Sequence, residues 1–222
     1  MSNLDELAAL LADLLDLRGR SFDDVSGVSL ASTVPLLVRA YLELADRHLQ
    51  APLLVLGPGT RTGIQIVHDD PHEIGPDRIA NAVAARERYG APCIVVDFGT
   101  STNFDAVSAE GAYVGGVLAP GIEISMDALF ARAARLTKVD FVAPASVIGK
   151  TTATALQSGL VYGFAGQVDG IVEHMRGELG DTAQAIATGG LAALIAPHSK
   201  TIEKVDPLLT LDGLRLVWDR NR

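Results

Sequence analysis

Three short β-like runs follow one another in the middle of this 222-residue chain, at residues 93–97, 102–108 and 112–118. Glycines lie in both gaps, at Gly99 and Gly111, and neither gap is long enough to contain a helix. Strands joined by such short turns pair antiparallel, because a parallel pair needs a crossover of a dozen residues or more. The chain is therefore predicted to contain an antiparallel β-meander.

Helices and single strands alternate in the rest of the chain, which indicates an α/β fold. Helices are expected over residues 4–15, 34–49, 77–89, 122–136 and 151–179, from residue 191, and over 211–220, and single strands over 25–31, 52–56 and 183–188. The second half thus has the order β-β-β-α-α-β-α, and the first half has only α-β-α-β-α. If the halves are duplicates, the first half lacks the opening strands.

Charge and cysteine content narrow the choice of partner and compartment. Lys and Arg number 18 against 27 Asp and Glu, and the resulting net charge of -9 would repel a phosphate backbone, so nucleic acid is not an expected partner. The single cysteine, Cys93, excludes a disulfide within one chain and favours a reducing compartment, so a cytoplasmic location is expected. The first residues, MSNLDELAALL, do not resemble a signal peptide, and no apolar stretch is long enough to cross a bilayer, so no membrane partner is expected.

The segment CIVVDFGTSTNFDAV at residues 93–107 is the most informative motif. An apolar strand ends at Asp97, and Phe98, Gly99 and Thr100 form the turn that follows. The carboxylate could hold a cation, while the turn's N–H groups and the threonine hydroxyl approach phosphate oxygens, because glycine lets the backbone come close. A plain hairpin with an Asp-capped turn explains the same spacing. The motif alone leaves phosphate chemistry and a simple turn open.

The residues Gly75, Pro76, Asp77 and Arg78 begin a predicted helix. The simplest interpretation is an aspartate N-cap beside a solvated arginine. In the functional interpretation, the carboxylate orients a hydroxyl group and the guanidinium binds a carboxylate or a phosphate. The pattern alone favours the first interpretation.

Two further segments and one loop are considered as ligand-binding sites. The predicted helix that begins near Thr151 and Thr152 offers free N–H groups and hydroxyls to an anionic or amide-bearing ligand, with simple capping as the alternative. Gly189 and Gly190 lie between a strand and a helix, where a flat ring or a ribose could approach the backbone, and a tight turn is the alternative. The loop GPGTRTG at 57–63 lacks the third glycine of the dinucleotide fingerprint, so NAD is not expected.

Six segments taken together resemble the type III pantothenate kinases, in the family's order and spacing. They are GPGTRTGIQI, DDPHEIGPDRIANA, YGAPCIVVDFGTSTNFDAV, GAYVGGVLAPGIEIS, VIGKTTATALQSGLVYGFAGQVDGI and ATGGLAALIA. The resemblance implies ATP-dependent phosphorylation of pantothenate to 4'-phosphopantothenate, the first step of coenzyme A biosynthesis. It also implies a duplicated ribonuclease-H-like fold of the actin-like ATPase type, with a first half over 1–91 that is truncated at its N-terminus and a second half over 92–222.

The same resemblance implies how pantothenate is bound. Asp77 would be the catalytic proton acceptor for the primary hydroxyl of pantothenate. The substrate would be held by Gly75, Pro76, Asp77 and Arg78, together with Thr152. In the family this pocket lies at a two-fold interface, so the resemblance also implies a homodimer.

The nucleotide and cation sites follow from the resemblance in the same way. ATP, bound with Mg²⁺, would contact Gly99 and Thr100 and, on the other side, Gly189 and Gly190. Asp97 would be the ligand of a monovalent cation, either K⁺ or NH₄⁺.

The chain departs from the family pattern at its beginning. Family members begin with a strand, an Asp-x-Gly-Asn-Thr phosphate loop and two further strands, whereas this sequence begins at the helix that follows them. That aspartate would coordinate Mg²⁺ and the loop would cradle ATP phosphates, so the chain as printed is expected to turn over ATP poorly. A non-catalytic regulatory or binding protein of the same family is the alternative.

Overall fold

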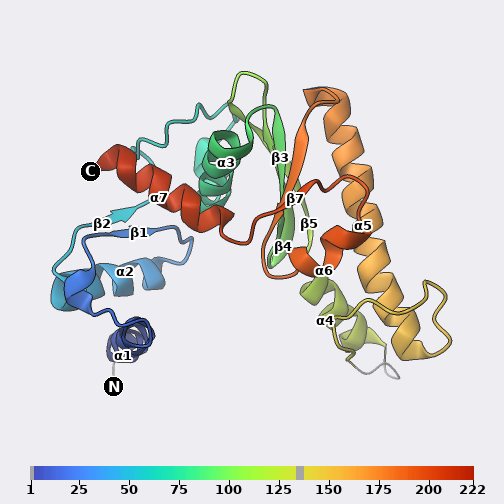
Figure 1. The fold of residues 1–222 in the computed structure, drawn as a ribbon, viewed down its shortest axis with the longest axis horizontal. Helices are drawn as coiled ribbons and strands as arrows, with labels where there is room; N and C mark the ends of the chain where they lie inside the picture. Colours follow the sequence, from blue (N-terminus) through green and yellow to red (C-terminus); the bar gives the residue numbers. More distant parts are fainter. Residues whose placement is uncertain (1–2, 134–137) are drawn as a thin grey trace.

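The computed structural model describes residues 3–133 and 138–222, and it contains two β-sheets (Figure 1). The smaller sheet pairs β1 (Val28–Leu30) with β2 (Leu53–Val55) in parallel. The larger sheet has the order β5-β4-β3-β6-β7. Its strands are β3 (Cys93–Phe98), β4 (Ser101–Val107), β5 (Tyr113–Pro120), β6 (Gln184–Thr188) and β7 (Lys204–Val205).

Seven α-helices connect and cover these strands. They are α1 (Asn3–Asp16), α2 (Pro35–Leu44), α3 (Pro76–Tyr89), α4 (Ile122–Arg132), α5 (Thr152–Leu179), α6 (Ala192–Ile195) and α7 (Leu209–Asn221) in the described part of the chain. None of the helices within these residues is long and apolar enough to span a membrane.

The predicted meander is confirmed. Strand β4 pairs antiparallel with both β3 and β5, and Gly111, at φ +78°, lies in the second turn. Strand β6 then adds to β3 in parallel, and β7 adds to β6 in parallel. In chain order the five strands therefore occupy positions 3-2-1-4-5 with the second one reversed, which is the arrangement of a ribonuclease-H-like fold.

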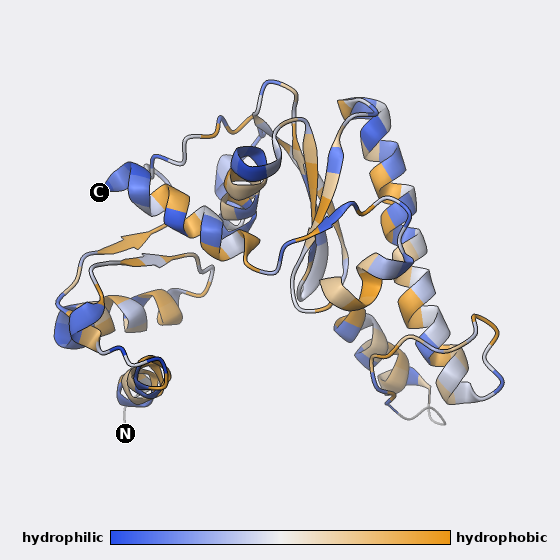
Figure 2. Ribbon diagram, viewed as in Figure 1, coloured by the Kyte–Doolittle hydropathy of each residue, from blue (hydrophilic) through white to orange (hydrophobic). Residues whose placement is uncertain are grey.

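Helices cover both faces of the five-stranded sheet, and each face has its own apolar core. Helices α3 and α7 lie on one face, and α5 and α6 lie on the other (Figure 1). Side chains alternate along β3: Cys93 and Val95 pack toward α3, while Ile94 and Val96 pack toward α5. Figure 2 shows hydrophobic residues along these central strands and alternating hydrophobic and hydrophilic bands along α7.

The two halves of the chain share an order of elements. The run α1-β1-α2-β2-α3 corresponds to α5-β6-α6-β7-α7, and in both runs the two strands are parallel neighbours. Helix α3, which the boundary at residue 91 assigns to the first half, shares a core with β3, β6 and α7. Two of its buried core residues are Ala80 and Val83. The boundary itself stays a prediction.

Some local structure differs from expectation. The two-residue strand β7 was not predicted, because so short a segment shows no period. The helix expected over 34–49 forms as α2 followed by a π-helical turn over Ala45–Leu49. The helix expected over 122–136 ends at Arg132, and the last part of that range lies outside the described residues.

Candidate active site

The first turn of α3 carries the predicted substrate-binding residues. Pro76 occupies the first helical position, where its fixed φ suits a helix and its missing N–H costs nothing. The carboxylate of Asp77 folds back toward Gly75: a Cβ on that glycine would lie 2.4 Å from Asp77 Oδ1. Asp77 is exposed to solvent. The N-cap is Gly75, without a side-chain capping hydrogen bond, so the interpretation of Asp77 as the N-cap is wrong. Asp77 lies in the first turn instead, and its carboxylate is accessible to a ligand.

Arg78 turns inward from the same helical turn, so its interpretation as a solvated residue is wrong. Its side chain is only 12% exposed, and it forms an ion pair with Asp105 on β4, which is fully buried. Both Nε and Nη2 of Arg78 reach Asp105 Oδ1, at 2.8 Å and 2.7 Å. The hydroxyl of Tyr113 on β5 donates to the same oxygen at 2.9 Å. The sequence motif did not show this partnership, because Asp105 lies 27 residues further along the chain.

Burial controls the acidity of this cluster. Loss of solvent raises the pKa of Asp105 to about 6, although the charge of Arg78 and the hydrogen bond from Tyr113 act to lower it. Burial also raises the pKa of Tyr113, and the nearby Asp105 charge raises it further. The tyrosine therefore remains a hydrogen-bond donor, and Asp105 is ionised above about pH 6.

Asp97 is the second-last residue of β3, close to the strand end that the motif predicted, and it lies on the face that α3 covers. Its Oδ2 accepts a hydrogen bond from Asn81 Nδ2 at 3.0 Å, and Asn81 Oδ1 accepts one from Thr210 at 2.7 Å. Burial raises the pKa of Asp97, the Asn81 hydrogen bond lowers it, and the charge of Asp77 raises it. The carboxylates of Asp77 and Asp97 therefore lie close enough to interact electrostatically.

Gly189 closes the space around the other oxygen of Asp97. A Cβ at Gly189 would lie 2.6 Å from Asp97 Oδ1 and 2.6 Å from the carbonyl oxygen of Phe98, so both oxygens face one small space. Gly189 also has φ +91°, a backbone conformation that L side chains rarely adopt. A carboxylate and a carbonyl directed at one space are ligands that suit a hard cation. Gly190, by contrast, faces open space.

The turn at Gly99 and Thr100 lies at the same end of the sheet. A Cβ on Gly99 would lie 3.8 Å from Asp97 Oδ1, and both turn residues are exposed. The start of α4 packs against this turn, since a Cβ on Gly121 would lie 2.1 Å from the carbonyl oxygen of Thr100. The structure thus brings together the predicted phosphate turn, the predicted cation ligand Asp97 and the glycine pair at 189 and 190.

Thr152 does not join this group. It is exposed at the start of α5, the helix that covers the opposite face of the sheet from α3 (Figure 1). The capping alternative is confirmed for its neighbour, because the side chain of Thr151 accepts a hydrogen bond from the backbone N–H of Thr154. Within one chain, Thr152 and the motif at 75–78 therefore occupy different faces of the sheet.

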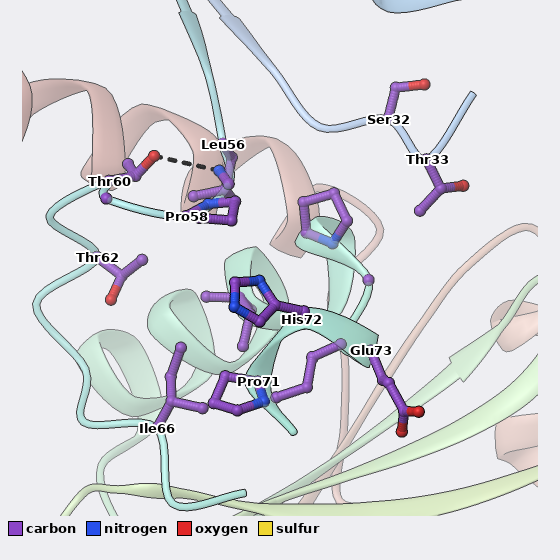
Figure 3. A pocket seen from close by; sticks show the side chains of 16 residues that line it. Ser32, Thr33, Leu56, Pro58, Thr60, Thr62, Ile66, Pro71, His72 and Glu73 are labelled. Atoms are coloured by element: carbon purple, nitrogen blue, oxygen red, sulfur yellow. Dashed lines mark hydrogen bonds between the residues drawn. The ribbon is translucent and has the colours of Figure 1, made fainter. Parts of the chain in front are cut away.

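A cavity of about 530 Å³ adjoins the start of α3 (Figure 3). It lies between the loop at 57–60 after β2 and the segment at 71–76, and Gly75 and Pro76 form part of its wall. The loop is fixed by a hydrogen bond from the backbone N–H of Gly57 to Thr60 Oγ1, at 3.1 Å. The size suits a small-molecule ligand, and the wall includes two residues that the sequence analysis assigned to the substrate, Gly75 and Pro76.

In the ranges 3–133 and 138–222, no three His, Cys, Asp or Glu side chains come together in a way that could hold a metal ion. Mg²⁺ that accompanies ATP is bound largely through phosphates and water, with one or two carboxylates. We assign no residue of the described chain to Mg²⁺.

Comparison with known proteins places this site in a family. Residues 1–174 match the family model of type III pantothenate kinase. The type III pantothenate kinase of Frankia alni is 54% identical over 98% of this chain and 85% of its own length, and that of Moorella thermoacetica is 50% identical over the same shares. A solved structure from Campylobacter jejuni, described as a conserved Baf family transcriptional activator, matches with a TM-score of 0.57. It is 20% identical and covers 85% of this chain and 80% of that one, so this likeness bears on the fold alone.

The matched stretch extends over almost the whole chain, 218 residues in the Frankia alni protein, so the α3 motif, the turn after β3 and the glycine pair after β6 lie within it. The fold and the clustered side chains agree with it. On these grounds the chain belongs to the type III pantothenate kinase family.

Proposed function

We propose that this protein transfers the terminal phosphoryl group of ATP to the primary hydroxyl of pantothenate, the first step of coenzyme A biosynthesis. Family membership supports the reaction. The main observation in support is that two adjacent residues of α3 differ in exposure: Asp77 is exposed to solvent, while Arg78 is held inward by a buried ion pair with Asp105. A free carboxylate beside a fixed guanidinium suits a substrate that has both a hydroxyl and a carboxylate.

Each of the two residues has a separate role in this proposal. Asp77 accepts the proton of the attacking hydroxyl, which it can reach because its side chain is exposed to solvent. Arg78 binds the pantothenate carboxylate: Asp105 occupies its Nε and Nη2, and within the described residues Nη1 has no hydrogen-bond partner. Phosphoryl transfer depends mainly on positioning and charge neutralisation, so an ordinary carboxylate suffices as the base.

The nucleotide and the monovalent cation belong at the neighbouring end of the sheet. ATP supplies the phosphoryl group, and we assign its binding to the exposed turn at Gly99 and Thr100 and to Gly189 and Gly190. We assign K⁺ or NH₄⁺ to Asp97, with the carbonyl of Phe98 as a second ligand; the convergence of their oxygens beside Gly189 supports this assignment. A cation here would offset the carboxylate's charge next to anionic phosphates.

We further propose that the protein is a homodimer in the cytoplasm. Thr152 lies on the face of the sheet opposite α3, so it can contact the same pantothenate as Asp77 only if a second copy supplies it. Two large apolar side chains just before α5, Val147 and Ile148, are 60% and 81% exposed, and an isologous interface here would cover them. The unpaired, buried Cys93 agrees with a reducing compartment.

The test of the proposed reaction is pantothenate-dependent release of ADP, with the phosphorylated product identified by mass spectrometry. Replacing Asp77 with Asn should reduce kcat by about 10²-fold or more while changing pantothenate affinity little, because only the proton acceptor is lost. Asp69→Asn is the matched control, since Asp69 is also exposed and lies in the segment that leads to the same helix. Full turnover in the Asp77 variant would remove Asp77 from the mechanism. Pantothenate binding without any turnover would favour the alternative of a non-catalytic binding protein.

A further inference from the structure

Asp105 occupies an unusual position for a carboxylate. It is fully buried in the middle strand of the meander, and its Oδ1 accepts one hydrogen bond from Arg78 Nε and one from Tyr113, with Arg78 Nη2 in ion-pair contact at 2.7 Å. Its Oδ2 is buried and has no hydrogen-bond partner among the described residues. A buried carboxylate with one oxygen unsatisfied costs stability, and apolar residues in such places are often at least as stable. Stability therefore does not explain why an aspartate is present here.

The contacts of Asp105 instead determine where Arg78 points. Arginine has a long, flexible side chain, and ordering it costs conformational entropy. Holding both Nε and Nη2 on one oxygen fixes the plane of the guanidinium as well as its position. The ring of Tyr113, whose centroid lies 6.0 Å from Arg78 Cζ, limits the guanidinium further.

Strand β5 leaves room for this arrangement. Gly116 pairs with Asp105 across the sheet, and a Cβ on Gly116 would lie 3.1 Å from Arg78 Nη2 and 1.9 Å from the carbonyl oxygen of Phe104. A larger residue would displace the guanidinium or the strand. Three elements, β4, β5 and α3, thus converge on a single side-chain orientation.

We propose that Asp105 is a positioning residue for pantothenate: it holds Arg78, with Tyr113 as a second anchor, so that the free edge of the guanidinium faces the substrate carboxylate. Asp105 itself is too deeply buried to touch substrate. This inference rests on the proposed role of Arg78 in binding pantothenate. It predicts that Asp105 acts on pantothenate affinity only through Arg78.

A double-mutant cycle on the full chain tests this coupling. Calorimetry measures pantothenate affinity for the parent protein, for Asp105→Asn, for Arg78→Met and for the two changes together. Asp105→Asn alone should weaken binding by roughly 10- to 100-fold, because misplacing a binding group by about 1 Å has effects of this size. In the Arg78→Met background the same change should have no further effect on affinity, within about twofold.

Steady-state kinetics supply a second readout. Asp105→Asn should raise the KM for pantothenate and leave the KM for ATP within about twofold, because the ATP site lies at another set of residues. Tyr113→Phe removes one hydrogen bond and leaves the ion pair, so it should produce the same selective change at a smaller size, about two- to fivefold. This variant also tests the proposal if Asp105→Asn does not fold.

The possible results separate this inference from the proposed function. Equal losses of affinity from Asp105→Asn with and without Arg78 would show that Asp105 acts as a general structural residue and would overturn the inference. The inference would also be wrong if Arg78→Met weakened binding while Asp105→Asn and Tyr113→Phe did not. Unchanged affinity in Arg78→Met would instead refute the role of Arg78 in the proposed function, and the inference would fall with it.

Discussion

Replacement of Gly189 by Ala should remove the dependence on K⁺ or NH₄⁺ that we propose for this protein. The new Cβ would lie 2.6 Å from Asp97 Oδ1 and 2.6 Å from the carbonyl oxygen of Phe98, the two oxygens that we assign to the cation. Because carbon and oxygen atoms do not approach so closely, at least one of these oxygens must move away. The proposed pair of cation ligands would then no longer face one space.

The structure also sets the size of the stability effect. Gly189 has φ +91°, and a non-glycine residue held in a left-handed conformation costs about 1–2 kcal/mol. Displacing the carbonyl of Phe98, which is a backbone atom at the end of a central strand, adds an overpacking cost of about 1–3 kcal/mol. The free energy of unfolding should therefore fall by about 2–5 kcal/mol.

Gly180→Ala is the matched control. Gly180 also has a φ in the left-handed region, +103°, but a Cβ there meets nothing within 4 Å, and Gly180 lies outside the sites proposed above. Urea unfolding of both variants would give the stabilities, and kinase activity titrated with KCl at constant ionic strength would give the cation response. The reasoning is refuted if Gly189→Ala keeps the parent's K⁺ activation curve, or if the two variants have equal stability.

Two further predictions concern helix α3 and the buried carboxylate beneath it. Gly213→Ala should destabilise the protein by about 2–3 kcal/mol in urea unfolding, because its Cβ would lie 2.0 Å from the carbonyl oxygen of Ala80. The control is Gly166→Ala in α5, whose Cβ would meet nothing within 4 Å and which should stabilise the protein by about 0.5–1 kcal/mol. Equal changes in stability would contradict this packing argument. The raised pKa of Asp105, about 6 against 3.8, means that the folded protein binds its proton more readily than the unfolded chain. Stability should therefore fall as pH rises from about 4 to 6, by up to about 3 kcal/mol. The charge of Arg78 and the hydrogen bond from Tyr113 oppose this rise of the Asp105 pKa, and the charge of Asp97 adds to it. The measurement is the free energy of unfolding as a function of pH, in the parent protein and in Asp105→Asn. If the variant keeps the parent's slope between about pH 4 and 6, another group is responsible for it.

Elements with a strong local pattern were predicted well from the sequence. The meander followed from short gaps that admit only antiparallel turns, and α5 followed from a long periodic segment with a threonine cap. Strand β7 has two residues and no period, so only its pairing with β6 reveals it. The packing of α3 against the five-stranded sheet could not be predicted from the sequence either, because periodicity shows which face of a helix is apolar but not which sheet covers it.

Only the part of the candidate site that lies within local motifs was predicted from the sequence. The motif at 75–78 identified Asp77 and the motif at 93–107 identified Asp97, and the structure brings the two carboxylates close enough to interact electrostatically. The inward turn of Arg78 depends on Asp105 and Tyr113, which are distant in sequence and meet it only after β4 and β5 have paired. A local pattern contains no information about such a contact.

Helix α3 connects the residues that we assign to the substrate with the residue that we assign to the cation. Its first turn carries Asp77 and Arg78, and Asn81, one turn later, holds Oδ2 of Asp97 at 3.0 Å. Asn81 is itself held by Thr210 on α7, so the orientation of Asp97 depends on how α7 packs against α3. A shift of α3 along the sheet would move the proposed base, the guanidinium and the support of the proposed cation ligand together. If these assignments hold, α3 keeps pantothenate and the proposed phosphate-binding turn at a fixed separation, which is the positioning that phosphoryl transfer requires.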